Sequence, residues 1–104
     1  MILVIGGRGA GKRSFVMDVL GFSPEQISED GPVLYGLEEI DPLPPLEALL
    51  GREVVVCREV GCGVVPMDRG DRDWREAVGR LCCDLAREAE AVYRIQCGLA
   101  MRLK

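Results

Sequence analysis

The chain lacks histidine altogether, and it contains no long hydrophobic run, no internal repeat and no low-complexity segment. The absence of an imidazole excludes Ser-His triads, histidine-zinc sites and phosphohistidine intermediates from its chemistry. A membrane-spanning helix needs ~18 consecutive apolar residues. The apolar stretch at residues 1–5 is too short for a signal peptide and has no basic flank. We therefore expect a cytoplasmic protein with no membrane partner.

Neither a disulfide framework nor a nucleic-acid-binding surface fits the composition. The five cysteines are odd in number and show no C-x-x-C spacing, which favours free thiols, mainly small buried apolar residues, in a reducing compartment. The net charge is −4, whereas a nucleic-acid binder presents a basic face. Residues 1–22 carry three basic and one acidic side chain, while residues 23–50 carry seven acidic and no basic ones. This asymmetry indicates a local anion site near the amino terminus.

Apolar patterning predicts one α/β domain that spans residues 1–104. Apolar or β-branched runs are typical of strands covered on both faces. Such runs occur at residues 1–5 and 53–57, and residues 91–95 are expected to form the final strand. Helical spacing or helix-start signals occur at residues 12–20, 23–26 and 71–89. Strands that alternate with helices imply a mostly parallel sheet of about four strands, in a reduced P-loop NTPase-like three-layer fold.

The apolar pattern gives specific predictions for the first helix and for residues 29–51. In the first helix, four apolar residues should share the core-facing side, namely Phe15, Val16, Val19 and Leu20. Residues 29–51 are expected to be irregular because of the prolines at positions 42, 44 and 45. A short strand at residues 33–35 and a short helix after Pro45 are the regular alternatives there.

The segment after the first strand matches the phosphate-loop pattern G-x-x-x-x-G-K. It consists of Gly6, Gly7, Arg8, Gly9, Ala10, Gly11 and Lys12. Glycines let the backbone wrap with its N–H groups inward, the next helix adds its positive end, and the lysine reaches the β- and γ-phosphates. The pattern predicts a site for ATP or GTP that continues through Arg13 and Ser14. The alternative is a glycine-rich turn that ends a strand.

Arg13 departs from this pattern, because a serine or threonine at this position normally holds Mg²⁺. Ser14 lies one residue further, about 100° around a helix, and does not simply substitute. Two interpretations stay open. Arg13 neutralises phosphate charge in place of the metal, which predicts weak Mg²⁺ dependence, or it lies in solvent, which predicts poor catalysis. We expect weakened Mg²⁺ binding and assign no protein metal ligand.

A second candidate loop follows the strand at residues 53–57. Ligands of parallel sheets lie beyond the carboxyl ends of the strands, so Glu59 is placed to orient or deprotonate an attacking hydroxyl. The alternative for Glu59 is a surface glutamate. The acidic residues between positions 25 and 47 indicate a solvated rim, with Asp30 as an alternative second metal carboxylate. Trp74 is interpreted as a core or interface anchor rather than a base-stacking platform.

Several motifs follow one another in a fixed order. They are E-V-G-C-G-V-V-P at residues 59–66, Arg72, W-R-E at 74–76, G-R-L at 79–81, L-A at 85–86 and G-L-A-M-R-L-K at 98–104. With the opening I-L-V-I-G-G at residues 2–7, they resemble the adenosylcobinamide kinase / adenosylcobinamide-phosphate guanylyltransferase family over residues 1–20 and 52–104. The resemblance implies NTP-dependent phosphorylation of the aminopropanol hydroxyl of adenosylcobinamide, in cobalamin biosynthesis or salvage. It places Lys12 and Glu59 at the catalytic positions and a corrinoid as the acceptor.

The middle of the chain does not share the resemblance, and this narrows the expected function. In the family this stretch carries the histidine that accepts the guanylyl group, so a histidine-free chain is not expected to perform that step. The alternatives to a kinase are a catalytically silent nucleotide-binding or assembly protein of the cobalamin pathway, and a loop that binds only an inorganic anion. No motif distinguishes ATP from GTP. Self-association through Trp74 or the long helix also stays open.

Overall fold

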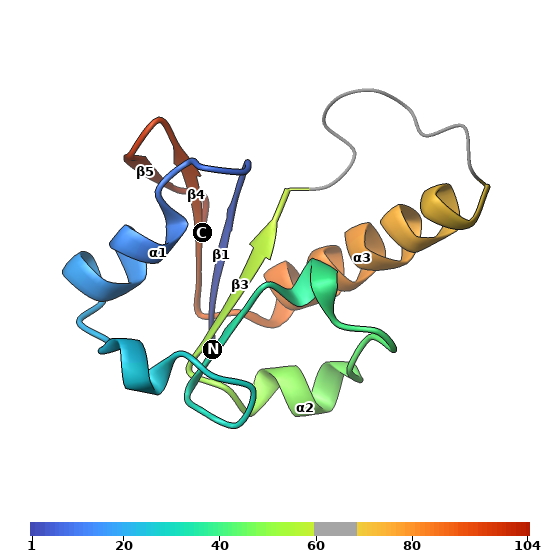
Figure 1. Cartoon of the computed structure of the whole chain (residues 1–104), viewed down its shortest axis with the longest axis horizontal. Helices are drawn as coiled ribbons and strands as arrows, with labels where there is room; N and C mark the ends of the chain where they lie inside the picture. The colour runs from blue at the N-terminus through green and yellow to red at the C-terminus, as the bar shows by residue number, and fades with distance from the viewer. Residues whose placement is uncertain (60–68) are drawn as a thin grey trace.

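The computed structural model describes residues 1–59 and 69–104, with side chains described for residues 1–59 and 72–104. Its centre is a five-stranded sheet with the strand order β2-β3-β1-β4-β5 (Figure 1). The strands are β1 (Ile2–Gly6), β2 (Val33–Tyr35), β3 (Val54–Arg58), β4 (Ala91–Gln96) and β5 (Leu99–Arg102). The helices are α1 (Lys12–Ser14), the π-helix η1 (Phe15–Val19), the 3₁₀ helices η2 (Pro24–Gln26) and η3 (Leu37–Glu39), α2 (Leu46–Leu50) and α3 (Arg69–Glu88). All strand pairs are parallel except β4 with β5, which confirms the predicted mostly parallel α/β fold.

Helices cover both faces of the sheet and make three layers. Figure 1 shows α1 on one side of the sheet and α2 and α3 on the other. Val55 packs into the cluster under α3, whereas Val54 and Val56 pack into the cluster under α1, and all three are fully buried. A strand covered on both faces has no solvent side, which explains why this sequence is apolar without alternation.

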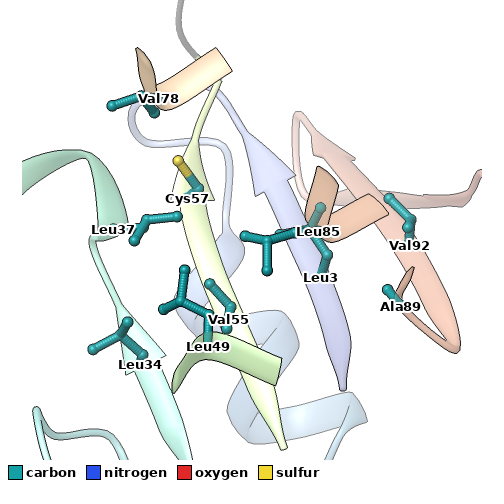
Figure 2. Close-up of a cluster of buried hydrophobic side chains, with 10 residues drawn as sticks. All are labelled: Leu3, Leu34, Leu37, Leu49, Val55, Cys57, Val78, Leu85, Ala89 and Val92. Carbon is teal, nitrogen blue, oxygen red and sulfur yellow. The ribbon is translucent and has the colours of Figure 1, made fainter. Parts of the chain in front are cut away.

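The long helix α3 packs its apolar stripe across three strands. In Figure 2, Leu85 lies over Leu3 of β1, and Ala89 lies beside Val92 of β4. Full burial of a side chain such as Leu85 is worth about 1.5–3 kcal/mol. The predicted amphipathic helix is confirmed. Neither α3 nor any other helix in the described part of the chain has the length and apolar character needed to cross a bilayer.

The first helix exists where expected but has a different geometry. Only Lys12–Ser14 is α-helical, and Phe15–Val19 continues as a π-helix. A π-helix turns less per residue than an α-helix, so the four apolar residues do not all remain on one side. Phe15 and Val16 are buried and Leu20 packs against the same cluster, but Val19 is 68% exposed. The expectation that Val19 faces the core was therefore wrong.

The middle of the chain is more regular than expected. The predicted capping box is present at the start of η2, where the Ser23 N–H donates to Gln26 Oε1 at 2.8 Å. Residues 29–51, expected to be irregular, contain β2, η3 and α2. Pro45 lies immediately before α2, in the extended conformation that ends a proline-rich stretch. The alternative predictions of a short strand at residues 33–35 and a short helix after Pro45 were correct, because the prolines flank these elements rather than interrupt them.

The strand at residues 91–95 is not the last one, as had been expected. A two-residue turn at Cys97 and Gly98, both with positive φ (52° and 74°), folds the chain back into β5. Positive φ at both central residues is the requirement of a type I′ hairpin turn. All four residues of β5 are exposed. The strand is only four residues long and contains no β-branched or aromatic residue, which explains why sequence analysis missed it.

Candidate functional site

The amino-terminal loop (residues 6–12) leaves the carboxyl end of β1 and enters α1. Gly9 and Gly11 have positive φ values of 71° and 100°, which side chains rarely adopt. The Ala10 N–H donates to the Gly7 carbonyl at 3.2 Å, so the chain turns back on itself here. The Ala10 carbonyl accepts from the Gly98 N–H at 2.9 Å, which ties the loop to the β4–β5 turn. The loop is therefore curled and held from two sides.

Lys12 is the charged residue at the base of this loop, and it is only 7% exposed. Its Nζ donates to the Gly7 carbonyl at 2.7 Å, across the loop. Within residues 1–59 and 72–104, no carboxylate forms an ion pair with Lys12. Burial of an unpaired cation is unfavourable. The arrangement is therefore suited to an anion that would neutralise Lys12.

Glu59 lies beside the loop, at the same end of the sheet. Its backbone N–H donates to the Gly6 carbonyl at 2.8 Å, because parallel β3 is paired with β1 up to that point. Its carboxylate forms an ion pair with Arg94 of β4, with 3.2 Å between Nη2 and Oε2. A pocket of about 320 Å³ lies between these groups and the β4–β5 turn. Its lining consists of Gly7, Arg8, Gly9, Ala10, Glu59, Arg94, Ile95, Gln96 and Cys97.

The sequence left two interpretations of Arg13 open, that it neutralises phosphate charge or that it lies in solvent, and the structure matches neither of them completely. It is exposed, and its guanidinium carbon lies 5.8 Å from the centre of the Tyr35 ring, a cation–π distance. Burial raises the pKa of Tyr35, while the nearby charge of Arg13 opposes the shift. Arg13 thus stacks on the end of β2 and faces a second pocket, of about 380 Å³, together with Glu39. It lines none of the first pocket.

The side chains around the loop do not fit a protein-held Mg²⁺ ion. Position 13 carries a guanidinium instead of a hydroxyl, and Ser14 is exposed on the next helical position. The Glu59 carboxylate is engaged by Arg94. Among the residues that the structure describes, no group of three or more Cys, Asp or Glu side chains gathers as a metal site.

The end of β3 is braced from the side of α3. The Arg58 N–H donates to Glu38 Oε1 at 2.7 Å. The Trp74 indole N–H donates to the Glu38 carbonyl at 3.1 Å, and Trp74 packs against the core. The interpretation of Trp74 as a core anchor is confirmed, and sequence analysis did not single out Glu38 as its partner.

The cysteines divide into a core pair and two exposed residues. Cys57 is fully buried, and a hydrogen bond with Cys82 of α3, together with burial, raises the pKa of the Cys57 thiol. Cys83 and Cys97 are exposed. The interpretation of the cysteines as buried apolar residues was wrong for Cys97, which lies in a turn. Adjacent helical residues point about 100° apart, so at most one of Cys82 and Cys83 was expected to face the core, and the exposure of Cys83 confirms this. Cys62 lies outside the described residues.

Asp30 is not near the loop. It is exposed in the turn before β2, at the opposite end of the sheet from Glu59, and it lines a hollow with Pro44, Ala48 and Arg52. The Arg52 guanidinium donates to backbone carbonyls of the same turn. Asp30 therefore belongs to a solvated rim, and its alternative as a second metal carboxylate was wrong.

The structure brings some of the predicted site residues together and leaves others apart. The structure places Gly7, Arg8, Gly9, Ala10 and Glu59 around one pocket, which Gly6, Gly11, Lys12, Arg13 and Ser14 do not line. Sequence analysis missed Arg94, although a single charge inside an otherwise apolar strand was a visible signal. The rest of the second motif, residues 60–66, lies outside the described residues.

Comparison with known proteins bears on the second half of the chain. A family model described as cobinamide kinase / cobinamide phosphate guanyltransferase matches residues 43–103, which is more than half of the chain. The matched region contains Glu59 and Arg94, and the amino-terminal loop precedes it. A search of curated proteins finds no match.

Proposed function

Because this chain belongs to the cobinamide kinase / cobinamide phosphate guanyltransferase family of cobalamin biosynthesis, we propose that it is a nucleotide-dependent kinase. It transfers the γ-phosphoryl group of ATP or GTP to the aminopropanol hydroxyl of a cobinamide. The observation that carries this proposal is the buried residue Lys12, whose ammonium donates to a carbonyl of its own loop at 2.7 Å and has no described carboxylate partner.

The roles of the residues follow from the chemistry of phosphoryl transfer. The hydroxyl oxygen forms a bond to the γ-phosphorus, the bond to the β,γ-bridging oxygen breaks, and a nucleoside diphosphate leaves. Loop N–H groups and Lys12 would neutralise the charge on the phosphate oxygens. Glu59 would orient the hydroxyl and accept its proton. Both groups lie at the carboxyl ends of neighbouring parallel strands, β1 and β3, which supports their joint action.

The second activity in the family's name is not proposed for this chain. Guanylyl transfer through a histidine needs an imidazole, and these 104 residues include none. The family match and the missing histidine together favour the kinase step alone.

Titration calorimetry with ATP, GTP and inorganic phosphate tests the nucleotide site. We expect both triphosphates to bind, with Lys12→Ala weakening the affinity at least about tenfold, or about 1.4 kcal/mol. Lys104→Ala is the matched control, since Lys104 is exposed and donates to carbonyls at the end of α3. Equal binding of phosphate and triphosphate would show an inorganic-anion site, and equal affinities of the two variants would refute the role of Lys12.

Mass spectrometry of cobinamide incubated with the chain and a triphosphate tests the reaction itself. We expect a product heavier by one phosphoryl group, which Lys12→Ala abolishes and Lys104→Ala preserves. One observation favours a second candidate, a catalytically silent nucleotide-binding or assembly protein: Arg13 stands in place of a metal-binding hydroxyl and stacks on Tyr35. Nucleotide binding without any phosphorylated product would establish that alternative.

A further inference from the structure

Arg94 and Glu59 meet across the end of β1. In the sheet, β1 lies between β3 and β4. Glu59 follows β3, and Arg94 is paired in register with Ile5 on β1. An ion pair between them must therefore pass over the point where β1 ends and the glycine-rich loop begins. An alanine Cβ at Gly7 would meet nothing within 4 Å, so this passage is open.

The contact is made by two donors of one guanidinium. Arg94 Nε and Nη2 both lie 3.2 Å from Glu59 Oε2. The side chains are 37% and 25% exposed, so the pair is partly screened from solvent. The two donors of the guanidinium converge on one carboxylate oxygen, so they anchor Oε2 at a fixed point beside the loop, which a single lysine contact does less firmly.

Arg94 is also an unusual residue for its strand, because it is charged while its neighbours are apolar or aromatic. Its neighbours in β4 are Tyr93 and the buried Ile95, and both belong to or pack against the core under α1. An exposed ion pair contributes little to stability, with a median of about 0–1 kcal/mol, so stability alone is a weak reason for a charge here. Both members of the pair line the same 320 Å³ pocket as Gly7 to Ala10. This shared lining links the pair to the nucleotide site.

We infer that Arg94 is a positioning residue, which holds the Glu59 carboxylate at the mouth of the amino-terminal loop so that it meets the acceptor hydroxyl. The inference rests on the proposed kinase function. A free glutamate side chain samples several rotamers, and the Arg94 contact restricts it to one. Arg94 acts through Glu59 and does not itself bind the phosphates.

The kinetic test compares Arg94→Gln, Arg94→Lys, Glu59→Gln and the double variant. A misplaced catalytic group costs on the order of 100-fold in rate, so we expect Arg94→Gln to lower kcat by about 10- to 100-fold. The Kd for the triphosphate should stay within about threefold of wild type. Arg94→Lys should restore part of kcat, because it keeps the charge but only one contact. The double variant should be no slower than Glu59→Gln alone.

Arg102→Gln is the matched control, because it removes an exposed arginine from neighbouring β5 without touching the pocket. If Arg94→Gln retains the kcat of Arg102→Gln, the inference is overturned. Additive losses in the double variant would show that Arg94 acts without Glu59, and a triphosphate Kd raised at least tenfold would make it a phosphate ligand instead. If Arg94→Gln does not fold, the kcat values of Arg94→Lys and Arg102→Lys are compared instead. Equal kcat values of these two variants would overturn the inference. Absence of turnover in the wild-type chain would refute the kinase proposal itself, a different result from loss in the variants alone.

Discussion

Replacing Gly6 by alanine is expected to destabilise the fold at the point where β1 becomes the loop. An ideal Cβ at this position would lie 2.6 Å from the Ile95 carbonyl oxygen and 3.4 Å from Ile95 Cβ. Gly6 and Ile95 are register partners in the β1–β4 ladder. The close contact is therefore with backbone, which has no rotamer that could relieve it.

The magnitude follows from the distance. Heavy atoms pack at about 3.5–4.0 Å, so β1 and β4 would have to separate locally by about 1 Å. Overpacking of this kind typically costs about 1–3 kcal/mol. Gly7→Ala is the matched control, because its Cβ would meet nothing within 4 Å and its φ is not positive. We expect that variant to lie within about 0.5 kcal/mol of wild type.

Urea unfolding, followed by the fluorescence of the single tryptophan, Trp74, measures both variants. The midpoint of Gly6→Ala should fall well below those of wild type and Gly7→Ala, with an unchanged slope. If Gly6→Ala unfolds at the same urea concentration as Gly7→Ala, the close approach of β1 and β4 at the loop is incorrect.

Three further predictions test other parts of the structure. Arg13→Ser, but not Arg13→Ala, should make triphosphate affinity rise at least about tenfold with Mg²⁺ in a calorimetric titration; equal Mg²⁺ effects in the two variants would contradict this. The hydrogen bond between Cys57 and Cys82 raises the pKa of Cys57, together with burial, and lowers the pKa of Cys82. The folded pair therefore loses one proton below about pH 9 and keeps the other above it, so stability should be greatest near about pH 9 and fall above it by up to about 1.4 kcal/mol per pH unit; a Cys57→Ala variant with the same slope in urea midpoints would rule this out. Trp74→Phe should lose about 1 kcal/mol in urea unfolding followed by far-UV circular dichroism, because the Trp74 indole N–H donates to the Glu38 carbonyl; no loss would show that the bond is unimportant.

Much of the fold could be read from the sequence because burial leaves a strong pattern. The valines at positions 54–56 face two cores, so the strand is apolar without alternation. The stripe through Val78 and Leu85 on α3 follows helical spacing because one face of that helix meets the sheet. By contrast, β5 is exposed along its whole length and left no such signal.

The candidate site could be predicted only where a motif dictates backbone geometry. The glycine pattern around Gly9 and Gly11 corresponds to two positive φ values. The ion pair of Arg94 and Glu59 joins residues 35 positions apart, and it depends on the order of three strands, which a linear pattern does not contain. The contact of Arg13 with Tyr35 likewise depends on where β2 joins the sheet.

The most direct test of the nucleotide site is a crystal structure of the chain with a non-hydrolysable triphosphate. We predict β- and γ-phosphates inside the amino-terminal loop, with Lys12 Nζ moved from the Gly7 carbonyl, now 2.7 Å away, to a phosphate oxygen. A triphosphate bound elsewhere, or a Lys12 that keeps its bond to Gly7 beside a bound nucleotide, would contradict the proposed function.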